Sequence, residues 1–406
     1  MQRDCNFCPK RFAISSFFAI FAPVMNNFRI TVKVGSNVLT RRDGTLDVTR
    51  MSAIVDQVAE LHRQGIQEIL VSSGAVASGR SEFKARANAA GDTNGSASVT
   101  ERLDTVAQRQ LFSAVGQAKL INKYYELYRD HGILCGQVLT TKETFGSRGH
   151  YLNQKNCMEV MLQEGVIPIV NENDTISVTE LMFTDNDELS GLIATMMSAQ
   201  MLILLSNIDG IYTGSPADPT SRLIPIISDD TDISEYIQTN KSSFGRGGMV
   251  TKHRIARKVA AEGIEVIISN GKRDNVLLEL VHLNAETGRN EIDPRVRCTR
   301  FKADSHETSN VKKWIAHSED FSKGAIYLNE GAVEALMGKK AASVLPVGVT
   351  RIEGEFEEDD IVRIISEADG QRLGVGKVSC SSDEACRIIG QKGQKPLVHY
   401  DYLSLV

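Results

Sequence analysis

The stretch IVNENDTISVTELMFTDNDELSGLIA, residues 169–194, connects an apolar segment to a predicted helix through a dense run of acidic side chains. Between Asn171 and Glu188 there are six carboxylates and three asparagines. Most such runs are solvated loops. Ligands of open α/β sheets, however, bind where the strands end at their carboxyl ends. Both interpretations stay open until the rest of the chain is considered.

Composition bounds the class of protein. A chain of 406 residues with 42% hydrophobic and 24% charged residues is typical of a globular protein with two or three domains. A net charge of −5 gives no reason to expect a polyanionic partner. Seven scattered cysteines indicate a reducing compartment, and we expect a cytoplasmic protein. Cys5 and Cys8 form a C-x-x-C pair without a second pair at zinc spacing, so no metal site is predicted from protein ligands.

The N-terminal segment has a separate character. Residues 11–25 are apolar and follow several basic residues, which resembles a signal peptide or a mitochondrial presequence. The segment is too short to span a membrane, and no later run is long enough. Met25 opens a natural first strand. We expect residues 1–24 to be a dispensable extension, disordered or mis-assigned, with a targeting peptide as the alternative.

The following segments alternate between short apolar strands and amphipathic helices. This pattern predicts an α/β fold, a three-layer sandwich with a mainly parallel sheet covered on both faces. The predicted strands are residues 28–34, 133–141, 166–170, 201–206 and 264–269, with another in EILVSS. The predicted helices are residues 49–65, 151–165, 186–200 and 249–263.

Two segments lack periodicity. Residues 81–101 are rich in Ala, Gly, Ser, Asn and Thr and predict a mobile surface loop. Residues 284–312 have little apolar content and predict a linker. We therefore expect a catalytic domain over residues 25–283, the linker, and a small, mainly β domain over residues 313–406.

Several glycine-rich or charged loops flank the predicted strands. No Walker A sequence, complete G-x-G-x-x-G, G-x-S-x-G or H-E-x-x-H occurs. KVGSN, SSGA, NENDT, DNDE, SNIDG and GRGGMVTK instead recur at strand ends or at a helix start. Glycine-rich turns and helix N-termini bind phosphate through free N–H groups, and lysines add charge where phosphoryl oxygens accumulate it. Each loop alone is weak evidence, but together in this order they predict phosphoryl transfer.

These motifs also carry a family resemblance. VKVGSNVL, VSSGAVASGR, AVGQ, VIPIVNENDT, DNDELSGLIA and GGMVTK occur in the order found in the glutamate 5-kinases of the amino-acid kinase superfamily. The later WI…GAIYLNEGAVEAL resembles a PUA domain. The resemblance covers about residues 28–400 and implies an amino-acid kinase-like fold followed by a PUA-like domain. It also implies an enzyme that phosphorylates the γ-carboxylate of L-glutamate with ATP, the first step of proline synthesis.

The resemblance assigns roles by matching position. The implied catalytic residues are Lys33, Lys252 and Asp187. The implied substrate-binding residues are Ser73, Gly74, Asp174, Asp185 and Asn186. The implied ATP-binding residues are Lys33, Gly35, Ser206, Asn207, Arg246, Gly247, Gly248, Met249 and Lys252. Asn207 stands where the family commonly has aspartate, and Arg246 stands where threonine is frequent.

The implied reaction answers the question raised by the acidic stretch. We expect Asp174 and Asn186 to hold the ammonium and nearby polar groups of glutamate, while Asp185 and Asp187 hold lysines in place. Lys33 lies inside an apolar strand, where an unpaired charge is costly to bury. The expected cofactors are ATP and Mg²⁺. The resemblance further suggests proline as a feedback inhibitor and a homo-oligomer, a dimer or a tetramer, with no membrane.

Two alternatives remain at this point. Another kinase of the superfamily, acting on acetylglutamate, aspartate, carbamate or UMP, would share GGM-x-x-K but not the NEND and DNDE loops. An RNA-binding protein would fit the PUA-like tail. From Lys323 to Val406, however, ten basic residues face thirteen acidic ones, including EGEFEEDD at 353–360, and RNA-binding domains usually carry a basic surface. We therefore expect no RNA binding.

Overall fold

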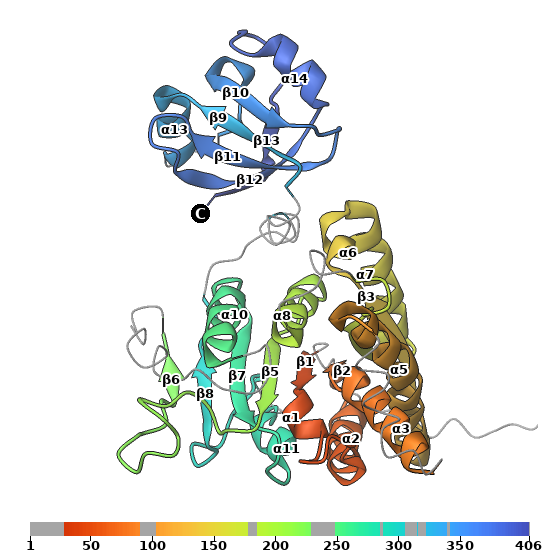
Figure 1. The fold of residues 1–406 in the computed structure, drawn as a ribbon. Helices are drawn as coiled ribbons and strands as arrows, with labels where there is room; N and C mark the ends of the chain where they lie inside the picture. The colour runs from red at the N-terminus through yellow and green to blue at the C-terminus, as the bar shows by residue number, and fades with distance from the viewer. Residues whose placement is uncertain are drawn as a thin grey trace, which may run out of the picture.

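The chain folds around two separate sheets in a computed structural model that describes residues 28–89, 103–177, 185–228, 248–284, 287–304, 315, 322–338 and 342–405. The larger sheet has eight strands in the order β3-β4-β2-β1-β5-β7-β8-β6 (Figure 1). The smaller has five strands in the order β10-β9-β11-β12-β13. The predicted extension at residues 1–24 lies outside the described residues.

The large sheet is mainly parallel, as predicted. Every pair of neighbouring strands is parallel except β7 and β8, which are antiparallel. Its strands are β1 (Arg29–Val34), β2 (Gln67–Ser72), β3 (Leu134–Thr140), β4 (Val166–Glu172), β5 (Met201–Ser206), β6 (Ile226–Ile227), β7 (Glu265–Asn270) and β8 (Cys298–Phe301). The helices of this part are α1 (Ser36–Leu39), α2 (Val48–Arg63), α3 (Ala75–Ala89), α5 (Thr105–Asp130), α6 (Lys142–Gly146), α7 (Arg148–Gln163), α8 (Asn186–Met196), α10 (Met249–Ala261) and α11 (Val276–Leu280).

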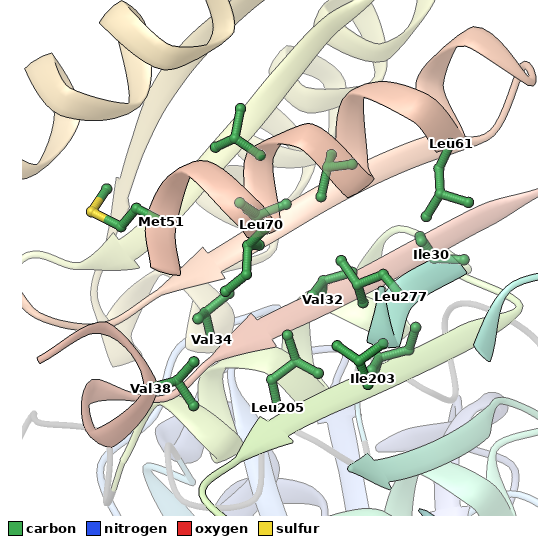
Figure 2. Close-up of a cluster of buried hydrophobic side chains, with 14 of the residues drawn as sticks. Ile30, Val32, Val34, Val38, Met51, Leu61, Leu70, Ile203, Leu205 and Leu277 are labelled. Atoms are coloured by element: carbon green, nitrogen blue, oxygen red, sulfur yellow. The ribbon is translucent and has the colours of Figure 1, made fainter. Parts of the chain in front are cut away.

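Alternation along the strands divides the core between two helix layers. Ile30, Val32 and Val34 of β1 pack with α2 and α11, as do Ile203 and Leu205 of β5 (Figure 2). The intervening Leu202 and Leu204 of β5 point to the other face and pack against α10. Because successive strand residues face opposite sides of a sheet, continuous apolar strands need helices on both. The three-layer prediction is therefore confirmed.

The second sheet belongs to a small C-terminal unit that is mainly β, as predicted. It contains β9 (Gly324–Leu328), α13 (Glu330–Met337), the 3-10 turn η2 (Pro346–Gly348), β10 (Val349–Gly354), β11 (Ile361–Ser366), β12 (Arg372–Val378), α14 (Ser382–Ile388) and β13 (Val398–Leu405). Its own apolar cluster includes Ile326, Leu328, Val362 and Ile364. A cluster of its own supports a separate folding unit, while Ile361 of β11 and Val375 of β12 join the cluster that includes Leu189 and Ile193 of α8.

Two helices near the predicted 81–101 loop correct the sequence interpretation. Helix α3 begins at Ala75 and continues to Ala89, so the first part of that segment is helical; the remainder, residues 90–101, lies outside the described residues. The small residues of α3 hid it, because they give almost no apolar periodicity. The long helix α5 was not predicted either; its N-cap is Asp104, whose side chain accepts a hydrogen bond from the Ala107 N–H at 2.7 Å.

The predicted linker at 284–312 also needs correction. Strand β8 lies inside it and pairs with both β7 and β6, so this part of the segment belongs to the large sheet. The strand is only four residues long, too short to give a periodic signal. The domain boundaries as a whole stay a prediction. Among the described residues, no helix is both long and apolar enough to cross a bilayer.

Candidate active site

Three elements bring two lysines onto one carboxylate. Lys33 comes from β1, Asp187 from the first turn of α8, and Lys252 from the first turn of α10. The Nζ atoms of Lys33 and Lys252 lie 2.7 Å from Oδ1 and Oδ2 of Asp187, respectively. Asp187 is fully buried, and the lysines are 6% and 7% exposed. The lysine that the sequence places inside an apolar strand is thus paired.

The charges of this group do not cancel. Burial alone would raise the pKa of Asp187, but Lys33 and Lys252 outweigh burial and hold the pKa below its ordinary value. Asp187 therefore stays ionised between two ammonium groups, and the three side chains carry a net charge of +1. A buried positive group of this kind stabilises the extra negative charge of a phosphoryl group in transfer.

The start of α8 connects this group to the neighbouring strand ends. Asp185 caps the helix, because its Oδ1 accepts the N–H groups of Asp187 at 2.9 Å and Glu188 at 3.1 Å. Burial, followed by the nearby charge of Asp187, raises the pKa of Asp185. Asp185 forms no ion pair with a lysine in the described structure, but the charges of Lys33 and Lys252 act on it and lower its pKa against the rise caused by burial. Its part in holding the lysines stays a prediction, and its hydrogen bonds are those of a helix cap.

Asn186 joins three loops through its side-chain amide. Its Nδ2 lies 2.8 Å from Ser73 Oγ and 3.0 Å from Asn171 Oδ1. The Asn171 amide in turn donates to Gln117 Oε1 at 2.8 Å. Gly74, next to Ser73, has φ of +112°, a conformation that favours glycine. The structure therefore brings together the predicted substrate residues Ser73, Gly74 and Asn186 between β2 and β4.

Asp174 lies beyond the end of β4 and is already paired. Its Oδ1 accepts from Arg109 Nε at 2.7 Å, and its Oδ2 accepts from Ser113 Oγ at 2.9 Å. Arg109 Nη2 also lies 2.8 Å from Glu172 Oε2. Asp174 and Glu172 are 6% and 4% exposed. A single arginine thus contacts two adjacent buried carboxylates.

Sequence reasoning missed the helix that supplies these partners. Arg109, Ser113 and Gln117 follow one another at intervals of four residues on α5, which places them on one face of the helix. Gln117 ends the AVGQ motif, but Arg109 and Ser113 lie before it, and their spacing alone is also common on water-facing helix surfaces. Glu172 is not among the predicted site residues, because its arginine partner lies more than 60 residues away in the sequence.

Two glycines fix α5 against α3. A Cβ on Gly116 would lie 1.8 Å from the backbone oxygen of Ala75, and a Cβ on Gly79 would lie 1.8 Å from that of Phe112. The two backbones therefore touch, and a larger residue at either position would push the helices apart. Ala75 follows directly after the Ser73–Gly74 loop, so this contact sets the distance between that loop and the polar face of α5.

The predicted nucleotide residues divide between described and undescribed parts. A Cβ on Gly35 would lie 3.1 Å from the Leu205 oxygen and 3.5 Å from Lys33 Nζ, so glycine keeps space beside the lysine. Ser206 ends β5, and Asn207 after it is exposed. Gly248 is the N-cap of α10 and Met249 its first residue. Arg246 and Gly247 lie outside the described residues.

A metal ion finds few protein ligands here. The described residues contain no group of three His, Cys, Asp or Glu side chains suited to one. The second oxygen of Asp185, Oδ2, is buried and has no hydrogen-bond partner among the described residues. Magnesium in nucleotide sites binds chiefly to phosphates and water, with one or two carboxylates. The residues present fit that mode, with Asp185 as the available oxygen.

Comparisons with known proteins identify the family of the chain. The model of the Amino acid kinase family matches residues 29–270, and that of the PUA domain matches residues 324–400. A glutamate 5-kinase of Bacteroides thetaiotaomicron is 64% identical over 377 residues, which cover 93% of this chain and 98% of the relative. A glutamate 5-kinase of Chlorobaculum tepidum is 44% identical over 383 residues, which cover 93% and 97%.

Proposed function

The chain belongs to the amino acid kinase family, and within it to the glutamate 5-kinases, and we propose that the Lys33–Asp187–Lys252 group carries out its phosphoryl transfer. The enzyme uses ATP to phosphorylate the γ-carboxylate of L-glutamate, the first step of proline synthesis. The extent of the similarity to glutamate 5-kinases argues against the other kinases of the superfamily, which act on acetylglutamate, aspartate, carbamate or UMP.

The single observation that carries the assignment of roles is the carboxylate shared by two lysines. An acceptor carboxylate and a γ-phosphate repel each other, by roughly 4 kcal/mol for one pair of unit charges at about 4 Å and an effective dielectric near 20. The positive charges of Lys33 and Lys252 offset this repulsion while the phosphoryl group passes from the ATP oxygen to the oxygen of the acceptor carboxylate. Asp187 keeps the two ammonium groups oriented, so that no reorganisation is needed during transfer.

The acceptor side uses the polar loops next to this group. Ser73, the backbone of Gly74 and Asn186 lie between the lysines and the acidic end of β4, so they bind the middle of the substrate. Asp174 receives the substrate ammonium, because a buried carboxylate forms a charge-assisted pair with a cation. Its contacts with Arg109 and Ser113 hold it in place for that ion pair.

The nucleotide side follows from the order of the strands. Strand β5 lies beside β1, so Ser206 and Asn207 end next to Gly35 and Lys33. With the start of α10, Gly248 and Met249, they line the ATP side, and Arg246 and Gly247 complete the same motif. Magnesium, when bound, neutralises charge on the ATP phosphates, and Asp185 Oδ2 is the side-chain oxygen proposed to contact it or its water.

Regulation and assembly are proposed on the family resemblance. Proline competes with glutamate at the amino-acid side of the site, because it carries the same α-ammonium and α-carboxylate. The chain forms a homo-oligomer, a dimer or a tetramer, and works in the cytoplasm, where its free cysteines stay reduced. The acidic balance of the C-terminal unit supports a regulatory role over RNA binding.

The test is glutamate-dependent formation of an acyl phosphate, trapped with hydroxylamine, across glutamate, acetylglutamate, aspartate, carbamate and UMP. We expect hydroxamate from glutamate only, with ADP released in equal amount and a requirement for Mg²⁺. Equal turnover with acetylglutamate, or ADP release without hydroxamate, would contradict the proposal. Retention on an RNA column at low salt checks the remaining alternative.

A further inference from the structure

Only part of the Arg109 guanidinium is bound by residues that the structure describes. Its Nε and Nη2 atoms are committed to Asp174 and Glu172. Its other terminal nitrogen, Nη1, makes no hydrogen bond to any residue that the structure describes, and the side chain is 22% exposed. A guanidinium has five N–H donors in one plane. Two carboxylates therefore fix its orientation, while no described residue holds Nη1.

The position of Arg109 along the sheet corresponds to the head of the substrate. The strands run in the order β5, β1, β2, β4, so the nucleotide loops, Lys33, Ser73 and the acidic end of β4 lie in a row. Neighbouring strands are about 5 Å apart, which places β1 and β4 roughly 10 Å from each other. A γ-carboxylate that reacts beside Lys33 directs the α-carbon of glutamate toward β4. The α-carbon carries two opposite charges, an ammonium and a carboxylate.

We propose that Arg109 binds the α-carboxylate of the amino-acid substrate through its free Nη1 while Asp174 binds the ammonium. An arginine and an aspartate in contact present a positive and a negative group side by side. That arrangement is complementary to a zwitterion, whose two charges are also adjacent. The inference rests on the proposed function and extends it, because it assigns substrate specificity to a residue on the helix that the sequence motifs do not mark.

The competing explanation is that Arg109 only holds Glu172 and Asp174 in place. Both explanations predict that loss of Arg109 weakens glutamate binding, so that loss alone decides nothing. They differ in whether the loss depends on the α-carboxylate. The experiment therefore combines a change in the protein with a change in the substrate.

The probes are L-glutamate and L-glutamate α-amide, which keep the γ-carboxylate acceptor and the ammonium and differ only in the charge of the α-carboxyl group. In the unmodified enzyme, kcat/KM should be about 10- to 100-fold lower for the α-amide, since a charge-assisted hydrogen bond is lost. In Arg109→Gln, kcat/KM for glutamate should fall by a similar factor, and the ratio between the two substrates should shrink to within about threefold.

Two further variants keep the test decisive. Lys119→Gln is the matched control, because Lys119 lies on the same helix and pairs with Glu82 at the surface; it should retain the ratio of the unmodified enzyme. Arg109→Lys keeps a charge without paired donors and should retain only part of the discrimination, even if Arg109→Gln does not fold. The KM for ATP should stay unchanged in every variant.

An unchanged ratio in Arg109→Gln, with both substrates weakened equally, would overturn the proposal, as would a ratio in Arg109→Lys equal to that of the unmodified enzyme. Failure of the proposed function looks different: the unmodified enzyme would then form no hydroxamate from glutamate. Binding of the two ligands to the ATP-free protein, measured by calorimetry, gives the same comparison without turnover.

Discussion

The two ends of the site use the same charged groups in opposite proportions. At the phosphoryl end, one buried carboxylate lies between two lysines, and the net charge is +1. At the amino-acid end, one arginine contacts two buried carboxylates. In the proposed function, the end with two lysines takes the phosphate and the end with two carboxylates takes the ammonium. Charge then orients the substrate along the row of strand ends in this proposal.

The largest effect should come from the phosphoryl end. Lys252→Ala removes one of the two charges that act on the moving phosphoryl group, and we expect kcat to fall by about 10²- to 10³-fold. The KM for glutamate should change by less than about threefold, because this charge matters most in the transition state. Steady-state kinetics with both substrates varied measures the two effects.

Lys258→Ala is the control, because Lys258 is exposed in the last turn of the same helix. Its kinetics should equal those of the unmodified enzyme. If Lys252→Ala instead raises the KM for ATP and leaves kcat intact, the lysine binds nucleotide and the contrast between the two ends loses its catalytic meaning.

At the amino-acid end the effect should be smaller and of another kind. Asp174→Asn keeps the size of the side chain and removes its charge, and the KM for glutamate should rise by about 10- to 150-fold with the KM for ATP unchanged. Glutarate, which lacks the ammonium, should be a poor substrate whose kcat/KM changes far less on this substitution. A KM for glutamate within about twofold of the original would mean that Asp174 only anchors its loop.

Ser113→Ala tests the helix that supports this end. It removes the hydrogen bond from Ser113 Oγ to Asp174 Oδ2 but leaves the ion pair with Arg109. A hydrogen bond to a charged group contributes about 1.5–3 kcal/mol. Because the Arg109 ion pair still holds Asp174, only part of this should affect substrate binding, and the KM for glutamate should rise by roughly three- to tenfold. An effect on kcat alone would show that Ser113 on α5 supports the phosphoryl end of the site instead of the amino-acid end.

The smallest effect on catalysis is expected at the opposite end of β2. Glu68 is fully buried, with Oε2 3.0 Å from His62 Nδ1. Burial raises the pKa of Glu68 to about 7, and contact with Glu68 raises the pKa of His62. Both folded-state values lie above the ordinary ones, so the folded protein binds more protons. Stability is then present at low pH and is lost as pH rises from about 4.5 through about 7.

Thermal unfolding across this window tests that sign. The Tm of the unmodified protein should fall from about pH 5 to about pH 8 more steeply than that of Glu68→Gln. Over this range the unmodified protein should lose about 3 kcal/mol more of its free energy of unfolding than the variant does. Exposed Glu60→Gln on the preceding helix should keep the original slope. Equal slopes in all three proteins would contradict the role of Glu68, and kcat/KM should be the same throughout.

The contrast between the two ends also marks what the sequence could predict. Lys33, Asp187 and Lys252 stand in motifs whose order follows the strands, and a buried lysine demands a partner. The strands and helices around them were predicted to within a few residues for the same reason, since their apolar periods are strong. Arg109 and Ser113 carry no such signal, because a polar residue every fourth position on a helix usually faces water. Their partners lie beyond an intervening strand, a distance that local patterns do not encode.

The shared carboxylate of Asp187 has a consequence for how the protein is made. Lys33 is translated early, while Lys252 follows Asp187 by 65 residues of chain. Until that second lysine leaves the ribosome, the carboxylate has only one of its two counter-ions. Strand β7, which pairs with β5 in the sheet, has not yet been synthesised either. Parallel sheets close long loops before their contacts form, so such assembly is slow. If the two lysines act as proposed, the nascent chain gains catalytic competence only when nearly all of its first domain exists, together with completion of the fold.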